Sequence, residues 1–446
     1  MRCLLYIPPF ECEGTHVANI ASVRVGGLTL FQRVCRSLQK AEFDEIIVAK
    51  PDTLEIVPDK LVTIPIQQLE YNLRICEISE ELLKIFDDDA PMCVCVLDGM
   101  ITPECLTMRP HGADVRIIAN QEQTGIYFIC HNTLEQIIKS EECLDDIEGI
   151  ISETFDAPEK TVYHRMMSSD DAKIAQNLLT KSLKKPLGRE SDGLVAFFIN
   201  RPISLQISKR IANSFITPNM VTAFGLIMGL AAAALMFLGI PLLMIVAVIL
   251  WQFSSIIDGI DGELARMRMS PSHKGEWFDT VADDVTNISF LVGLGHAVSV
   301  YYTPKADTAV AWFNTYHEWL FYIACGVALL MTITVLWFYR EFVKMGIASH
   351  NHFEWGFESE NKQNKSDEKR GILRKTVDLI AGGFAWIAKR DFYTFLIMWL
   401  VIFGLYLPAY GTMLIGASFV GIGGIIALTI RAIRMSAKKR KEASSK

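Results

Sequence analysis

Four aspartates in one stretch of this sequence are spaced so that their carboxylates could act together in a chemical site. Asp258 and Asp261 are three residues apart, and Asp279 and Asp283 are four apart. On helices these spacings put the members of each pair on one face. Two such helices facing each other would gather four carboxylates, which repel one another unless a cation joins them. Because hard oxygen ligands favour Mg²⁺ or Mn²⁺ over zinc, the spacing predicts a divalent-metal site.

Small and basic residues accompany the aspartates in the spacing DxxDGxxARx₈GxxxDxxxD. Gly262 and Ala265 would leave room beside the helix for a flat base or a pyrophosphate, and Ala265 shares the face of Asp258. Arg266 is placed to bind a phosphate through charge-assisted hydrogen bonds. Gly275 stands at the fixed position ahead of the second pair. The pattern therefore combines a metal site with space and charge for a phosphate-bearing ligand.

The motif crosses the end of the second and the start of the third of six apolar stretches. These are Met220–Leu238, Leu242–Ile257, Phe278–Val300, Trp319–Phe338, Phe392–Leu407 and Thr412–Ile433. A bilayer needs roughly 20 apolar residues per helix, so we expect an all-α transmembrane domain of six spans. The turns after the first and fifth stretches contain no Lys or Arg, which predicts that both termini and the aspartates are cytosolic.

The net charge of −7 and the mean hydropathy of +0.27 average over two different halves. Residues 1–190 contain 19 Lys+Arg against 31 Asp+Glu, a net −12, and the remaining residues contain 24 against 19, a net +5. Nucleic-acid binding needs clustered positive charge, so the acidic half disfavours it. Nine of the ten cysteines lie at or before Cys143 without a CxxC pair, which suits a reducing cytosol.

These patterns divide the chain into four parts: a cytosolic domain at residues 1–165, a linker with membrane-surface amphipathic helices at 166–215, a six-span domain at 216–435 and a basic cytosolic tail at 436–446. In the first part, β-rich runs such as Arg2–Ile7 and Leu61–Ile66 alternate with helical patterns such as Leu69–Phe86. This alternation predicts an α/β sandwich with a largely parallel sheet. The basic linker suits anionic headgroups, and an ordinary solvated connection is the alternative.

The complete motif, with six spans around it, resembles the signature of the CDP-alcohol phosphotransferase family over roughly residues 190–435. The resemblance implies that a CDP-linked alcohol donates its phosphoryl-alcohol group to the hydroxyl of a second alcohol and releases CMP. It also implies that Asp258, Asp261 and Asp279 ligate Mg²⁺ or Mn²⁺, while Asp283 shares a second metal and acts as the catalytic general base. A homodimer is a further implication.

The substrates are open at this point. We expect CDP-diacylglycerol as donor and a polyol or polyol phosphate as acceptor, in phospholipid synthesis. The alternative is a CDP-inositol-type donor transferred to a lipid or polyol alcohol. A transporter with a regulatory domain is a hypothesis from another functional class. It is disfavoured because the acidic residues cluster at one membrane boundary and no sequence repeat is evident.

Further candidate ligands lie at helix ends. Asn219 and Thr222 precede or begin the first span in a segment that resembles the same family, and they join the nucleotide-binding candidates Gly262, Ala265, Arg266 and Gly275. A helix start at Pro218 and Asn219 is the alternative. The acceptor-binding candidates are basic residues at inner span ends, where topology alone would also place them: Arg340, Lys344, Lys389 and Arg390.

The segment VGGLTLFQRVCRSLQKAEFDEIIVA from Val25, followed by VCVLDG, resembles sugar-nucleotide or polyol-phosphate nucleotidyltransferases. Val96–Gly99 resembles the strand of that family that ends at a metal-binding Asp, here Asp98. An active member carries a glycine-rich loop with a basic residue after the first strand. Here that segment contains the isolated Gly14, two prolines and two glutamates. We expect a degenerate domain, as in a decayed form of fused inositol-phosphate cytidylyltransferase and phosphotransferase proteins; an active cytidylyltransferase is the alternative.

Overall fold

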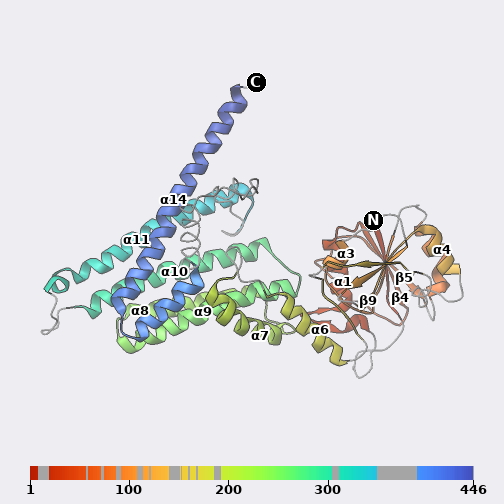
Figure 1. Ribbon diagram of the computed structural model, residues 1–446, viewed down its shortest axis with the longest axis horizontal. Helices are drawn as coiled ribbons and strands as arrows, with labels where there is room; N and C mark the ends of the chain where they lie inside the picture. Colours follow the sequence, from red (N-terminus) through yellow and green to blue (C-terminus); the bar gives the residue numbers. More distant parts are fainter. Residues whose placement is uncertain are drawn as a thin grey trace, which may run out of the picture. The chain divides into compact units, whose positions relative to one another are not determined.

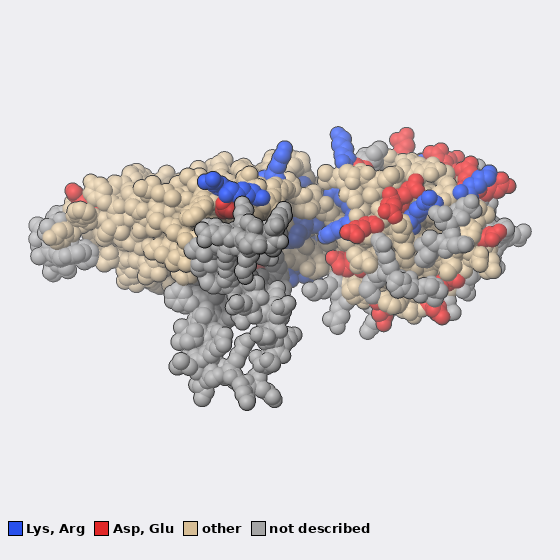
Figure 2. All heavy atoms as spheres, turned by 90° about the horizontal axis from the view of Figure 1, so that it is seen from above, with Lys and Arg blue, Asp and Glu red and all other residues tan. Residues whose placement is uncertain are grey.

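The computed structural model describes most of the chain in two compact units. The described residues are 1–8, 20–56, 59–71, 75–86, 92–107, 114–119, 122–139, 151, 153–158, 161–166, 169–184, 192–303, 311–348 and 389–444. The first unit comprises residues 1–184, 209–215 and 265–270, and the second comprises 185–208, 216–264 and 271–446. In the face drawn in Figure 2, acidic side chains gather on the first unit, whereas the helices of the second show a largely uncharged surface.

The first unit contains a seven-stranded mixed sheet in the order β10-β8-β9-β6-β1-β4-β5 (Figure 1). Its strands are β1 (Arg2–Tyr6), β4 (Glu45–Pro51), β5 (Ile66–Tyr71), β6 (Met92–Val96), β8 (Val115–Ala119), β9 (Glu122–Ile129) and β10 (Glu153–Asp156). Four of the six neighbouring pairs are parallel, and β9 runs antiparallel to both of its neighbours. The predicted α/β class is confirmed.

Helices and two small strand pairs complete this unit. They are α1 (Leu30–Lys40), α2 (Ser79–Ile85), α3 (Glu104–Thr107), α4 (His131–Lys139), α6 (Ser169–Ser182), the pair β2 (Arg24–Val25) and β3 (Leu28–Thr29), and the pair β7 (Gly99–Ile101) and β11 (Tyr163–Arg165). Thr29 caps α1, since its side chain accepts a hydrogen bond from the Gln32 backbone N–H. Leu4 and Tyr6 alternate along β1 and share a buried cluster with Leu82 of α2 and Leu134 of α4.

Two predicted elements in this unit are wrong. Residues Ile66–Tyr71 form strand β5, where a helix over Leu69–Phe86 and a strand over Leu61–Ile66 were expected. The strand pairs in parallel with β4, and it buries Leu69 and Tyr71 at alternate positions. Pairing with a distant strand therefore overrides the local helical spacing. Among the described residues of the predicted helix, helical structure is confined to the 3-10 helix η2 (Ile75–Ile78) and the short α2.

The second unit is helical. Its elements are the π-helix η4 (Ala196–Asn200), α7 (Arg201–Ile211), α8 (Pro218–Phe237), α9 (Pro241–Met267), α10 (His273–Tyr301), α11 (Ala311–Met345), α13 (Arg390–Ile402) and α14 (Tyr406–Ser444); the ends of α7 and α9 belong to the first unit. Among the described residues, four segments are long and apolar enough to cross a membrane: Pro218–Phe237, Pro241–Met267, Tyr316–Met345 and Tyr406–Ile426. Helix α13 has 13 residues, which rise only about 20 Å.

Local signals set the ends of the helices that carry the motif. Thr217 accepts a hydrogen bond from the Met220 backbone N–H, and Pro218 is the first residue of α8. Gly239, with a φ of 67°, follows the end of α8 and lets the chain turn into α9. The Ser272 side chain accepts a hydrogen bond from the Gly275 backbone N–H and so caps α10. These caps place the aspartates at the ends of α9 and α10 that lie beside their connection.

Helices α8 and α10 pack closely because glycines face bulkier groups. A Cβ on Gly229 of α8 would lie 2.4 Å from the Thr286 methyl group of α10, and one on Gly293 would lie 2.6 Å from the Ala233 carbonyl oxygen. Small residues of this kind let helices approach in a membrane protein. The close approach brings the first turns of α8 beside the acidic turns of α10.

Candidate metal centre

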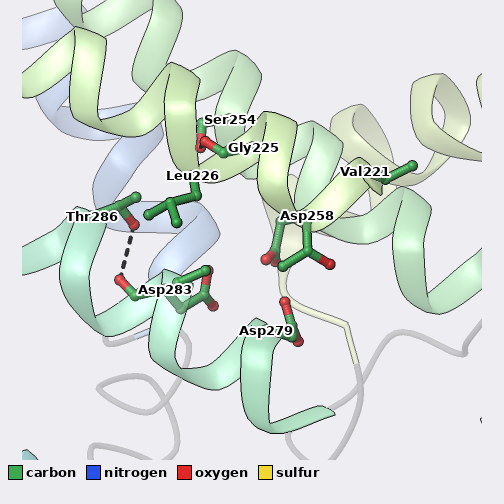
Figure 3. A pocket seen from close by; sticks show the side chains of 10 residues that line it. Val221, Gly225, Leu226, Ser254, Asp258, Asp279, Asp283 and Thr286 are labelled. Atoms are coloured by element: carbon green, nitrogen blue, oxygen red, sulfur yellow. Dashed lines mark hydrogen bonds between the residues drawn. The ribbon is translucent and has the colours of Figure 1, made fainter. Parts of the chain in front are cut away.

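Three aspartates from two helices converge on one point. Asp258 comes from α9, and Asp279 and Asp283 come from consecutive turns of α10. Each offers a carboxylate oxygen, and these three oxygens lie within 4.8 Å of one another. Figure 3 shows the three side chains directed toward a shared space between the helices. Such an all-oxygen group is the ligand set that Mg²⁺ and Mn²⁺ prefer.

The surroundings of the three aspartates also fit a cation. The cavity that they line has a volume of about 10 Å³, which is room for a species the size of one water molecule. The Asp279 Oδ1 atom is buried there and has no hydrogen-bond partner among the described residues. A buried carboxylate oxygen without a donor is costly, and a bound divalent ion would satisfy it.

Asp261 lies outside this group of three. Its carboxylate accepts a hydrogen bond of 2.5 Å from the Thr222 hydroxyl of α8 and another from the Gly262 backbone N–H, and the side chain is buried. Two of the nucleotide-binding candidates therefore contact a candidate metal ligand. The structure shows Thr222 holding Asp261 in place between α8 and α9.

One of the acceptor-binding candidates reaches the cluster. Arg390, the first residue of α13, forms an ion pair with Asp283 through Nη1, and the same atom lies 3.6 Å from Asp258 Oδ1. Lys389 immediately precedes α13. Lys344 instead pairs with Glu341 on its own helix, and Arg340 is exposed on α11.

The remaining nucleotide-binding candidates lie near the two helix ends. Asn219 is exposed in the first turn of α8, and a Cβ on Gly275 would lie 3.0 Å from its Oδ1 atom, so these two residues are neighbours. Ala265 is half-buried and Arg266 is exposed in the last turn of α9. Their roles in nucleotide binding stay predictions.

Two hydroxyl residues of the site were missed by the sequence reasoning. Ser254 of α9 donates a hydrogen bond to the Gly225 carbonyl oxygen at 3.1 Å, and Thr286 of α10 donates one to the Asp283 carbonyl oxygen at 2.9 Å. Both line the cavity (Figure 3). Ser254 lies four residues before Asp258, so helical spacing was the available signal.

A larger cavity opens one helical turn farther along α10. It has a volume of about 270 Å³, and its lining is mainly apolar: Asn287, Met331, Tyr393, Leu396, Thr412, Met413, Ile415, Gly416, Ala417, Phe419 and Val420. Asn287 follows Asp283 by four residues, and its Oδ1 atom is buried without a hydrogen-bond partner among the described residues. The polar edge of this apolar cavity at Asn287 thus lies one turn of α10 from Asp283.

In the first unit, Asp98 is enclosed by its neighbours. The Tyr163 hydroxyl donates a hydrogen bond of 2.9 Å to Asp98 Oδ2, and Arg165 Nε lies 3.8 Å from the same oxygen. Burial raises the pKa of Asp98 to about 6. The Asp258 group is the one cluster of three metal-ligating side chains within the described ranges. Gly14 and the rest of the predicted degenerate loop lie outside these ranges.

Comparison with known proteins bears on the second unit. Residues 215–407 match the family described as CDP-alcohol phosphatidyltransferase. This stretch therefore resembles a CDP-alcohol phosphatidyltransferase domain. It contains the convergent aspartates and the helices from α8 to α13, so the resemblance based on the motif is confirmed.

Three curated relatives share the name "Bifunctional IPC transferase and DIPP synthase". The protein from Thermococcus kodakarensis is 36% identical over 128 residues, which cover 29% of this chain and 28% of the relative. The protein from Archaeoglobus fulgidus is 37% identical over 124 residues, which cover 28% and 24%. The matched part thus spans about a quarter of each relative. Among solved structures, HddC from Yersinia pseudotuberculosis has a TM-score of 0.31 and 12% identity, covering 40% of this chain and 98% of that chain.

Proposed function

We propose that this protein is an integral membrane CDP-alcohol phosphotransferase that releases CMP as it transfers a phosphoryl-alcohol group to a second alcohol. The observation that carries the proposal is the convergence of Asp258, Asp279 and Asp283 within a stretch that matches the CDP-alcohol phosphatidyltransferase family. A divalent cation bound there, Mg²⁺ or Mn²⁺, would neutralise the charge that develops on the CMP leaving group.

The side chains around the cluster have distinct roles in this proposal. Asp258 and Asp279 would hold the cation, and Asp261, fixed by its hydrogen bond from Thr222 of α8, would support it. Asp283 removes the proton of the acceptor hydroxyl as its oxygen attacks the phosphorus that bears the transferred alcohol. The bond from this phosphorus to the CMP oxygen breaks, and CMP leaves with the electron pair. Arg390 orients Asp283 and offsets part of the negative charge.

CDP-diacylglycerol is the donor that we favour. The apolar cavity of about 270 Å³, whose edge at Asn287 lies one turn of α10 from Asp283, supports a lipid-linked substrate, because an acyl chain is stabilised by apolar side chains while the pyrophosphate stays at the aspartates. A polyol phosphate as acceptor would pair its phosphate with Arg390 and Lys389. The resemblance to fused inositol-phosphate cytidylyltransferase and phosphotransferase proteins keeps a second candidate open, a CDP-inositol-type donor with a lipid or polyol acceptor.

The membrane arrangement is also part of the proposal. Helices α10 and α13 would join the four apolar helices as the third and fifth of six spans, with both termini and the aspartates in the cytosol. Membrane lipids surround the domain, and two copies form a homodimer. The sheet domain has a structural or regulatory role, which the enclosure of Asp98 by Tyr163 and Arg165 supports.

Labelled CDP-diacylglycerol and a panel of polyols and polyol phosphates, supplied to the full chain in detergent or vesicles, test the proposal. CMP release and a new lipid product are expected. Asp258→Asn and Asp283→Asn should each abolish turnover. Asp284→Asn is the matched control, because Asp284 points to the Tyr339 hydroxyl, 2.7 Å away, and should retain activity. Near-normal turnover in either of the first two variants would refute the assignment.

The same assay separates the alternatives. CDP-inositol incubated with a lipid or polyol alcohol should give no CMP if CDP-diacylglycerol is the donor. Incubating the protein with CTP and candidate polyol phosphates tests the sheet domain. Pyrophosphate release there would identify an active cytidylyltransferase and overturn the degenerate role.

A further inference from the structure

A buried ionic network lies on α9 beside the motif. Glu263, whose side chain is 0% exposed, accepts hydrogen bonds from the hydroxyls of Ser204 and Ser208 on α7, both at 2.7 Å. Its Oε1 atom also lies 2.9 Å from Arg201 Nη1. One fully buried carboxylate thus joins α9 to α7 through three contacts.

The network extends from Arg201 to a second buried carboxylate. Arg201 Nε donates to Asp192 Oδ2 at 2.9 Å, and Nη2 donates to Asp192 Oδ1 at 3.2 Å. The exposed fractions of the Asp192 and Arg201 side chains are 7% and 16%. The guanidinium therefore has the two-pronged geometry of the strongest charge-assisted hydrogen bonds.

Stability alone does not explain this triad. Taking three charges out of water is costly, and well-packed apolar residues commonly stabilise a fold as much or more. What directed contacts add is a defined position and rotation of the joined elements. Ser204 and Ser208, four residues apart on α7, both contact Glu263, which defines where α7 lies along α9.

The network reaches the backbone next to a candidate metal ligand. Arg201 Nη1 lies 3.5 Å from the carbonyl oxygen of Gly259, the residue after Asp258. A Cβ on Gly259 would lie 3.0 Å from that nitrogen and 3.4 Å from Ser204 Oγ. Helix α7 therefore packs directly against the turn of α9 from which Asp258 projects.

The same stretch of chain also contacts the beginning of α13. The Ala196 backbone N–H, between Asp192 and Arg201, donates a hydrogen bond of 2.7 Å to Asp391 Oδ2. Asp391 follows Arg390, which pairs with Asp283. The segment from Asp192 to Arg201 thus touches two of the elements that supply side chains to the acidic cavity.

From this geometry we propose that Glu263 and Arg201 are positioning residues for the reaction, which hold α9 in the rotation at which Asp258 joins Asp279 and Asp283. This inference rests on the proposed metal-dependent function. Asp258 and Glu263 are five residues apart, so they project about 140° apart around α9. Contacts that draw Glu263 toward α7 therefore turn Asp258 away from α7 and toward α10.

The tolerance for error in this rotation is small. A turn of about 20° in α9 would move a carboxylate that lies roughly 6 Å from the helix axis by about 2 Å. Metal–ligand distances must be correct within about 0.2 Å. Loss of partners that orient metal ligands typically costs 10–100-fold in metal affinity or activity, and we expect an effect of this size.

The experiment measures Mn²⁺ affinity by electron paramagnetic resonance on the full chain in detergent, beside kcat, KM and Tm. Glu263→Gln keeps the side-chain volume and an acceptor oxygen for one of the two serines, but it removes the charge that holds Arg201. Its Kd for Mn²⁺ should rise at least 10-fold and its kcat should fall, with little change in donor KM. Ser208→Ala, which keeps the ion pair, should give a smaller rise and serves if the first variant fails to fold.

Thr334→Val is the matched control, because Thr334 is equally buried and joins α11 to α14 through a hydrogen bond of 3.1 Å to the Gly421 carbonyl oxygen. It should lower Tm without changing Mn²⁺ affinity. If Glu263→Gln or Ser208→Ala lowers Tm but binds Mn²⁺ as the unmodified protein does, the network is only structural and the inference is wrong. If the unmodified protein itself binds no Mn²⁺, the proposed function fails as well.

Discussion

Replacing Arg390 with methionine should strengthen metal binding while it weakens the use of a phosphate-bearing acceptor. Arg390 contacts Asp283 and lies 3.6 Å from Asp258 Oδ1, so its guanidinium occupies the same acidic group that would hold the cation. A divalent ion must therefore compete with a positive charge already present. Methionine has a similar length and no charge, so the variant removes this competition.

The magnitude follows from the distances and the exposure of the groups. Two unit charges 3.6 Å apart interact by about 4–5 kcal/mol at an effective dielectric constant of 20. The Asp258 and Asp283 side chains are each 33% exposed, so solvent screening leaves a smaller net effect, on the order of 1.4 kcal/mol. That difference is tenfold in an equilibrium constant. Arg390→Met should therefore lower the Kd for Mn²⁺ about 10-fold.

The same variant should weaken the binding of a phosphate-bearing acceptor. If Arg390 binds the phosphate of the acceptor, its loss should raise KM for a polyol phosphate by 10-fold or more and leave KM for the corresponding polyol unchanged. Arg390→Lys is the control, because it keeps the charge but loses the planar guanidinium, and it should fall between the two proteins. An unchanged or weaker Mn²⁺ affinity in Arg390→Met would show that the guanidinium does not compete with the metal.

Three further outcomes are expected. Thr222→Val removes the hydrogen bond that holds the buried Asp261 carboxylate and should lower kcat several-fold, measured by CMP release. It should also lower Tm, because a hydrogen bond to a charged group contributes about 1.5–3 kcal/mol. The free energy of unfolding should fall by about 3 kcal/mol as pH rises from about 4 to 7, because the pKa of Asp98 is raised to about 6 in the folded protein and the stabilising proton is lost above it. Asp98→Asn should abolish this fall, and thermal melting of both proteins at several pH values measures it. Gly229→Ala places a methyl group 2.4 Å from α10 and should cost about 1–3 kcal/mol, whereas Gly326→Ala, with no atom within 4 Å, should leave Tm unchanged.

The helical part of the site could be predicted because its information is local. The four-residue spacing of Asp279 and Asp283 places both on one face of α10 wherever that helix lies, and the structure shows them together. Bringing Asp258 to this pair required only that α9 and α10 face each other. By contrast, Arg390 reaches Asp283 from a helix more than a hundred residues later, and no local pattern distinguishes it from other basic residues at inner span ends.

The sheet domain shows the same division between local and distant causes. The capping box of α1 and the buried run of β6 can be read from neighbouring residues. Strand β5 cannot, because its alternation of buried and exposed residues has meaning only against β4. A helical prediction failed there since IQQLEY satisfies both periods, and a backbone partner twenty residues earlier decided between them.

The two aspartates of α9 show how one helix can serve two neighbours. Residues three apart on a helix share a face but differ in direction by about 60°. Asp258 uses one direction to meet α10, and Asp261 uses the other to meet the Thr222 hydroxyl of α8. Glu263, two residues on, points to α7. Because these three acids bind three different helices, α9 cannot turn to improve one contact without weakening the others. The rotation of α9 about its axis therefore depends on all three contacts. The Glu263 variant should change this rotation by loosening the contact with α7, and the Thr222 variant should change it by loosening the contact with α8.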